Sequence, residues 1–111
     1  MSKRPPKRSE RTLRRERERT VTRLRDDRER LFRLEPGGNP DHPLDASSAA
    51  VIEAHAVGVP CPQCGGGQEV TEHVALVHGH QPVRLRETKL RCRQCGSTRS
   101  LWFKIVGTGL N

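Results

Sequence analysis

Large apolar side chains are scarce in this chain. It has no tyrosine, two phenylalanines, one tryptophan and one methionine, and only 32% of its residues are hydrophobic. No apolar run approaches the roughly 20 residues that a membrane-spanning helix needs. The basic N-terminus is not followed by an apolar segment, so we expect no secretory signal and predict a cytoplasmic location.

The sequence also lacks the patterns that most enzymes require. It shows no paired carboxylates, no Ser/His/Asp series and no glycine-rich phosphate loop. We therefore expect a protein that is not an enzyme and has no small-molecule substrate.

The few apolar residues are unevenly distributed along the chain. Residues 1–35 offer little that could enter a core, so the compact part is expected from about the last 65 residues. A domain of that size has a marginal hydrophobic core and usually needs a metal, disulfides or a partner chain. Four cysteines supply the stabilisation, and in a reducing compartment two close pairs are more typical of metal ligands than of disulfides.

Two Cys-x-x-Cys-Gly motifs stand out in the second half of the chain. Their cysteines are Cys61, Cys64, Cys92 and Cys95, and 27 residues lie between Cys64 and Cys92. Each motif is a turn that brings two thiolates together, and its glycine allows the left-handed backbone that such a turn needs. Two turns complete a tetrahedron of four sulfurs, which predicts one structural Zn²⁺ with no open position for a catalytic water.

Other interpretations of these cysteines remain open. A redox Cys-x-x-Cys usually opens a helix in a larger α/β domain and needs only one pair. Iron in a site of four cysteines has similar local geometry, which leaves an iron-bound electron carrier as an alternative. Histidine ligands are not required, because four cysteines already close a tetrahedral site.

Strand-like alternation surrounds the two motifs. Between them, Val70, Val74 and Leu76 alternate with other residues, a turn is expected at 78–82, and a second strand carries Leu85 and Leu90. After the second motif, residues 99–106 alternate as a third strand, with Leu101, Phe103 and Ile105 on one face. This order predicts a small metal-stabilised β domain, a three-stranded antiparallel ribbon within residues 60–106, followed by a flexible tail at 107–111.

With both motifs and this strand pattern, the chain resembles the zinc-ribbon superfamily over about residues 60–106. That superfamily includes transcription factors, RNA polymerase subunits, ribosomal proteins and small bacterial proteins. The resemblance implies a fold and a bound metal, and it selects no single function.

The first third of the chain is expected to be a charged helix or a partly disordered arm, residues 1–35. Residues 8–35 contain no glycine or proline and are mostly helix formers. Glu29 is expected to pair with Arg33, four residues later. The apolar residues form a rough stripe of Leu13, Val21, Leu24 and Leu31. Arg17 and Arg28 interrupt this stripe, so it is compatible with only a weak helix-mediated dimer, and the oligomeric state stays open.

A proline- and glycine-rich linker is predicted to follow, over residues 36–59. Pro36-Gly37-Gly38-Asn39-Pro40 ends the preceding helix. Within the linker a short helix is expected at about 47–57, stopped by Gly58. Its apolar face is predicted to consist of Ala50, Val51, Ala54 and Val57.

Positive charge is concentrated in two parts of the chain. Residues 1–35 hold 14 Lys/Arg and 7 Asp/Glu, residues 36–82 hold five acids and no Lys/Arg, and residues 83–111 hold seven Lys/Arg and one acid. Because arginine pairs well with phosphates, we predict binding of RNA or DNA through the basic arm and the ribbon. The candidate contacts on the ribbon are Arg84, Arg86, Lys89, Arg91, Arg93, Arg99, Trp102 and Lys104.

Two alternatives accompany this prediction. Trp102 could stack on an unpaired base, or it could cover the 47–57 helix as part of the core. The whole chain could also be a protein-interaction adaptor that docks on a larger assembly, such as the transcription or translation machinery. Nucleic-acid binding should weaken steeply with salt, which separates the two functions.

Overall fold

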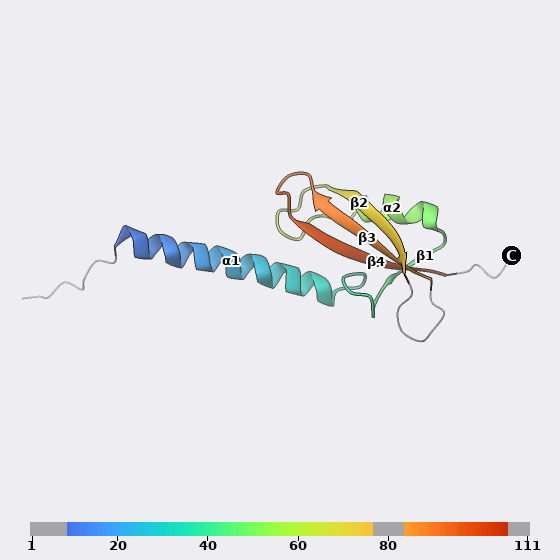
Figure 1. The fold of residues 1–111 in the computed structure, drawn as a ribbon, viewed down its shortest axis with the longest axis horizontal. Helices are drawn as coiled ribbons and strands as arrows, with labels where there is room; N and C mark the ends of the chain where they lie inside the picture. Colours follow the sequence, from blue (N-terminus) through green and yellow to red (C-terminus); the bar gives the residue numbers. More distant parts are fainter. Residues whose placement is uncertain (1–8, 77–83, 107–111) are drawn as a thin grey trace, which may run out of the picture.

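The computed structural model describes residues 9–76 and 84–106, which form two helices and four strands (Figure 1). The first eight residues of the predicted arm, the turn predicted at 78–82 and the tail predicted at 107–111 lie outside the described residues. The elements are α1 (Glu10–Leu34), β1 (Leu44–Ala46), α2 (Ala49–Val57), β2 (Gln68–Leu76), β3 (Leu85–Cys92) and β4 (Thr98–Ile105). Figure 1 shows α2 lying against the sheet and α1 extending away from it.

The sheet has four strands in the order β1-β4-β3-β2. Strand β3 is antiparallel to β2 and to β4, whereas β1 runs parallel to β4 with Leu44 opposite Phe103. The three predicted strands are therefore present and antiparallel, but the predicted three-stranded ribbon is corrected to a mixed four-stranded sheet by β1. No sequence pattern predicts β1, since three residues are too few to show an alternation. In the fold, β1 covers part of the open edge of β4.

The core lies between α2 and one face of the sheet. Ile52 and Ala56 of α2 are fully buried, and they pack in one cluster with Leu90, Leu101 and Phe103. The predicted apolar face of α2 is wrong, since all four of its residues are exposed. This helix is apolar nearly all round, so periodicity could not select the face, and the sheet packs on the i, i+4 pair Ile52 and Ala56 instead.

Helix α1 begins at a serine cap and ends in the core. The Ser9 hydroxyl accepts a hydrogen bond from the Thr12 backbone N–H at 3.2 Å, which satisfies a free donor of the first turn. Near the other end, Phe32 is only 7% exposed and belongs to the core cluster. The expectation that the core comes from about the last 65 residues is thus corrected, because Phe32 contributes from the first third of the chain.

A tight turn lets the chain come back beside the end of α1. A Cβ atom at Gly38 would overlap the Phe32 carbonyl oxygen, so this turn requires glycine. The stripe residues Leu13, Val21, Leu24 and Leu31 remain exposed, at 39% to 61%. Of the helices in the described part of the chain, none is both long and apolar enough to cross a membrane.

Candidate metal centre and charged surfaces

The four cysteines come together in two knuckles, the first at residues 61–65 and the second at residues 92–96. Their sulfurs all lie within 4.8 Å of one another, with 3.7 Å between Cys61 and Cys95 and 3.4 Å between Cys64 and Cys92. A tetrahedral ion with metal–sulfur bonds of about 2.3 Å would hold its sulfurs about 3.8 Å apart. A disulfide would need about 2.05 Å, and all four cysteines are free. The cluster is therefore positioned to hold one metal ion.

The backbone of each knuckle turns around its sulfurs. Gly65 and Gly96 both have a φ of 76°, which confirms the prediction of a left-handed glycine after each cysteine pair. Backbone N–H groups donate to three of the sulfurs: Gln63 to Cys61 at 3.4 Å, Gly66 to Cys64 at 3.4 Å and Gln94 to Cys92 at 3.3 Å. These donors offset part of the negative charge that four thiolates bring to the site.

The thiols have unequal acidities. Burial raises the pKa of Cys61, but the hydrogen bond with the Ser97 hydroxyl and two backbone N–H groups outweigh it, and the pKa is lowered to about 6. The Ser97 hydroxyl and backbone likewise lower the pKa of Cys95. At Cys64 the Gly66 N–H lowers the pKa, but the neighbouring thiols raise it to about 11. Four thiolates this close repel one another, and a bound cation removes that repulsion.

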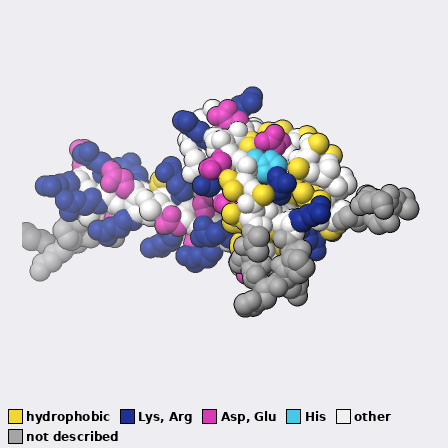
Figure 2. Space-filling model, turned by 45° about the vertical axis from the view of Figure 1, so that its right-hand side comes forward, with side chains coloured by type: hydrophobic (Ala, Val, Ile, Leu, Met, Phe, Trp, Pro, Cys, Tyr) yellow, Lys and Arg dark blue, Asp and Glu magenta, His cyan; other side chains and the backbone are white. Residues whose placement is uncertain are grey.

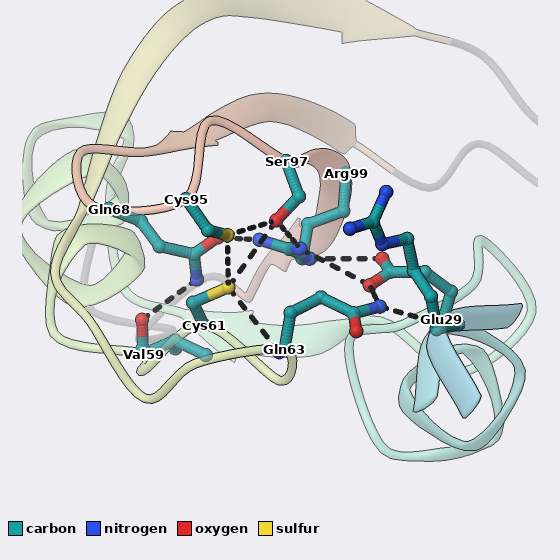
Figure 3. A network of polar contacts seen from close by, with 9 residues as sticks. Glu29, Val59, Cys61, Gln63, Gln68, Cys95, Ser97 and Arg99 are labelled. Atoms are coloured by element: carbon teal, nitrogen blue, oxygen red, sulfur yellow. Dashed lines mark hydrogen bonds and ion pairs between the residues drawn. The ribbon is translucent and has the colours of Figure 1, made fainter. Parts of the chain in front are cut away.

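Arg99 forms a buried ion pair with Glu29 beside the knuckles (Figure 3). Its Nε donates to Glu29 Oε1 at 3.1 Å, and its Nη2 donates to Glu29 Oε2 at 3.2 Å and to Ser97 Oγ at 2.7 Å. Its Nη1 donates to Gln68 Oε1. The side chain of Arg99 is 3% exposed and that of Glu29 is 20% exposed. Burial lowers the pKa of Arg99, but the hydrogen bonds and charge of Glu29 outweigh it and the pKa is raised.

This ion pair corrects two expectations. Arg99 was expected among the nucleic-acid contacts, but its guanidinium is buried, so a nucleic acid on the surface has no access to it. Glu29 was expected to pair with Arg33 on its own helix, but its carboxylate binds Arg99. Sequence reasoning missed the pair because its members are 70 residues apart, and no local pattern connects them.

The first knuckle is also bound directly to α1. Gln63 stands between two of the cysteines, and its Nε2 donates to Glu29 Oε2 at 2.7 Å and to the Arg25 carbonyl at 2.8 Å. In return, Arg28 Nη1 donates to the Gln63 carbonyl at 3.3 Å. On the other knuckle, Ser97 contacts Arg99 and the sulfurs of Cys61 and Cys95. The cysteine cluster and the C-terminal part of α1 therefore share one hydrogen-bonded network.

Several of the predicted contacts on the sheet are paired with acids. Each pair joins a basic side chain to an acid on a neighbouring strand or knuckle: Lys89 with Glu72 at 3.2 Å, Arg93 with Glu69 at 3.7 Å, and Lys104 with Asp45 at 3.4 Å. Arg84 and Arg91 are exposed, and Arg86 is half-buried. Strand pairing therefore distributes acids among the bases and reduces the basic cluster that the sequence suggested.

Trp102 lies on the opposite side of β4 from Leu101 and Phe103. Its neighbours along the strand belong to the core under α2, where the His55 ring meets the Phe103 ring edge-on at 5.4 Å. Trp102 is partly buried and lines a shallow hollow with Phe32, Arg33 and Pro40. The alternative in which Trp102 covers α2 is therefore wrong, because α2 packs on the other face.

Arginine side chains cover much of α1 (Figure 2). All ten arginines of this helix are exposed. One of them, Arg28, also reaches the first knuckle, while Glu29 and Phe32 contact the sheet. The N-terminal half of α1 extends beyond the sheet (Figure 1). The strongest unbalanced charge in the described structure thus belongs to the helix.

Comparison with known proteins adds no relative. No protein-family model, curated protein or solved structure matches this chain. The cysteine cluster is the feature that supports a zinc-ribbon-like site.

Proposed function

We propose that this protein is a zinc-binding protein without enzymatic activity, and that it binds nucleic acid through α1. The observation that carries the proposal is the excess of positive charge on the part of α1 that extends beyond the sheet. Residues 10–25 contain seven arginines, all exposed, and three glutamates. Four more bases precede them in the sequence. Such a surface attracts phosphates, and binding is favourable because the counterions of the phosphates are released.

Zinc is the ion that best suits the cysteine cluster. Four thiolates in a closed tetrahedron are its usual structural ligands, and zinc has no redox chemistry that the site would need to control. In this proposal the ion contributes stability to a small core, and the sheet provides a fixed base for α1. The zinc takes no part in recognition, because its four positions are filled by protein sulfurs.

Metal analysis of the purified protein tests the identity of the ion. We expect one zinc per chain and no visible absorption. Iron with a thiolate-to-metal absorption band would overturn the zinc assignment and favour the electron carrier instead.

Salt titration tests the nucleic-acid proposal. The full chain is mixed with labelled DNA or RNA, and binding is followed by fluorescence anisotropy between 50 and 200 mM salt. We expect the affinity to fall by about 10³-fold or more over this range if six or more phosphates are contacted. The absence of binding to any nucleic acid at 50 mM salt would overturn the proposal.

A second candidate function, a protein-interaction adaptor, has its own supporting observation. Val51 and Val57 of α2 are each 44% exposed on the face turned away from the core. An apolar contact there would be insensitive to salt, since the hydrophobic effect does not depend on charge. A partner retained at high salt, and lost when Val51→Glu and Val57→Glu are combined, would favour the adaptor.

A further inference from the structure

Four arginines lie on one ridge of α1. Arg11, Arg15, Arg19 and Arg23 follow one another at intervals of four residues, and all four are exposed. Side chains four residues apart are neighbours on a helix surface, and like charges in this relation destabilise an isolated helix. An anion that lies along the helix would relieve the repulsion among these four arginines.

Acidic residues reduce this charge only in part. Glu18 lines the same surface hollow as Arg15, Arg19 and Arg23, and two aspartates, Asp26 and Asp27, stand at its far end with Arg30. Arg30 approaches Asp27 at 3.8 Å. The free half of α1 also carries Glu10 and Glu16, but residues 10–25 hold seven arginines against three glutamates, so the ridge keeps a net positive charge.

From this ridge we infer that α1 binds double-stranded DNA by lying in its major groove, an inference that rests on the proposed function. Helix α1 has 25 residues, so it is about 37 Å long, and an α-helix is about 10 to 12 Å wide with its side chains. The major groove of B-form DNA is about 12 Å wide and admits one helix. The N-terminal half of α1 extends beyond the sheet (Figure 1), and the four arginines of the ridge are exposed, so a groove of this width can approach them.

Two other kinds of nucleic acid fit α1 less well. Single strands are usually held by stacking on aromatic side chains, but the one aromatic residue of α1 is Phe32, which is buried in the core. Double-stranded RNA has a deep, narrow major groove that does not admit a helix. The duplex partner is therefore DNA.

Recognition through this helix depends on phosphates more than on bases. The sequence of α1 contains no asparagine or glutamine, the side chains that pair with adenine in the major groove. Arginine can bind guanine, but ten arginines on one helix cannot select a single register. We expect weak sequence preference and strong salt dependence.

The first experiment compares three nucleic acids with the zinc-loaded full chain at 100 mM salt. The probes are a 20-base-pair DNA duplex of mixed sequence, one of its single strands, and an RNA duplex of the same sequence. We expect the DNA duplex to bind at least about tenfold more tightly than the other two. Equal or tighter binding of the single strand or the RNA would overturn this inference and leave the proposed function standing. If none of the three binds when the comparison is repeated at 50 mM salt, both this inference and the proposed function are overturned.

The second experiment locates the contact on α1. The triple variant R15Q/R19Q/R23Q removes three positive charges and keeps good helix formers, and circular dichroism verifies that its helix is intact. The salt slope is the slope of the logarithm of the binding constant against the logarithm of the salt concentration. We expect its magnitude to decrease by about 2.7 and the affinity for the DNA duplex to fall at least about tenfold. The charge-retaining variant R15K/R19K/R23K should preserve the salt slope.

A comparison variant distinguishes the ridge from the sheet. R84Q/R91Q/R93Q removes the same number of charges from exposed positions on the sheet and the second knuckle. We expect a smaller loss of affinity for the DNA duplex than for the ridge variant R15Q/R19Q/R23Q. An equal or larger loss, or an unchanged affinity of the ridge variant, would place the contact on the sheet and overturn the inference.

Discussion

The Arg99 guanidinium lies against the Glu29 carboxylate, with Nε 3.1 Å from Oε1 and Nη2 3.2 Å from Oε2. This pair joins β4 to α1, and the same guanidinium donates to Ser97, whose hydroxyl contacts two cysteine sulfurs. Arg99 also lies over the Phe32 ring, 5.9 Å from its centre. One side chain thus connects the cysteine cluster, the sheet and the end of the helix.

Glu29→Gln should destabilise the protein more than other changes of a single acid. The variant leaves the positive charge of Arg99 buried without its carboxylate, and breaking such a pair costs on the order of 3 kcal/mol. Urea denaturation of the zinc-loaded protein measures the change in the free energy of unfolding. Glu72→Gln is the matched control, because Glu72 is 54% exposed in its pair with Lys89 and should cost less than about 1 kcal/mol. Equal effects of the two variants would show that the buried pair contributes no special stability.

Removal of the metal should unfold the sheet. Structural zinc contributes on the order of 10 kcal/mol or more to folding in small domains, and the core here is small. A chelator, or Cys92→Ser, should abolish the cooperative unfolding transition. The tertiary contacts of the sheet should also be lost from the NMR spectra. If the metal-free chain keeps a cooperative transition, the site is not the structural element that we propose.

Zinc affinity should rise with pH. Cysteine binds zinc as the thiolate, so protons compete with the metal. The metal-free chain is expected to be unfolded, so its thiols have the ordinary cysteine pKa of about 8.5 and are mostly protonated at pH 7. Zinc binding at pH 7 must therefore release protons from the cysteines, and the zinc affinity should increase as the pH rises from 7 to 9. Competition with a chromophoric chelator measures the affinity, and an affinity independent of pH over this range would contradict binding of zinc by thiolates.

Two neighbouring residues of α2 should respond very differently to truncation. Ile52→Ala removes a fully buried side chain and should cost about 2–4 kcal/mol. Val51→Ala, one residue away, removes a side chain that is 44% exposed and should cost less than about 1 kcal/mol. Thermal or urea unfolding of both variants checks which face of α2 enters the core. The reverse order would restore the face that the sequence suggested.

The sequence predicts most reliably where the chemistry is local. The spacing of each cysteine pair and the glycine after it determine the turn, so the cluster and the left-handed Gly65 and Gly96 were predicted correctly. Alternation of apolar residues likewise located the strands around Leu90 and Phe103.

Features that depend on distant parts of the chain could not be predicted. Strand β1 has three residues, and its conformation depends on the edge of β4 that it meets, about 60 residues later. The buried side of α2 depends on the sheet, because the helix is apolar in nearly every direction. No local pattern predicts that Arg99 is buried, because its partner Glu29 is 70 residues away in the sequence. In each of these cases the conformation or the burial of the residue depends on tertiary packing, which a local sequence pattern does not contain.

The separation of Glu29 and Arg99 along the chain has a consequence for synthesis. Chains fold from the N-terminal end as they leave the ribosome, and Glu29 emerges 70 residues before its partner. Helix α1 therefore exists for some time with neither its carboxylate partner nor the second cysteine pair. It can settle on the sheet only when β4 has been made, because Phe32 packs with Leu101 and Phe103 of that strand. Attachment of α1 is thus a late event in synthesis, set by the last strand of the sheet to appear.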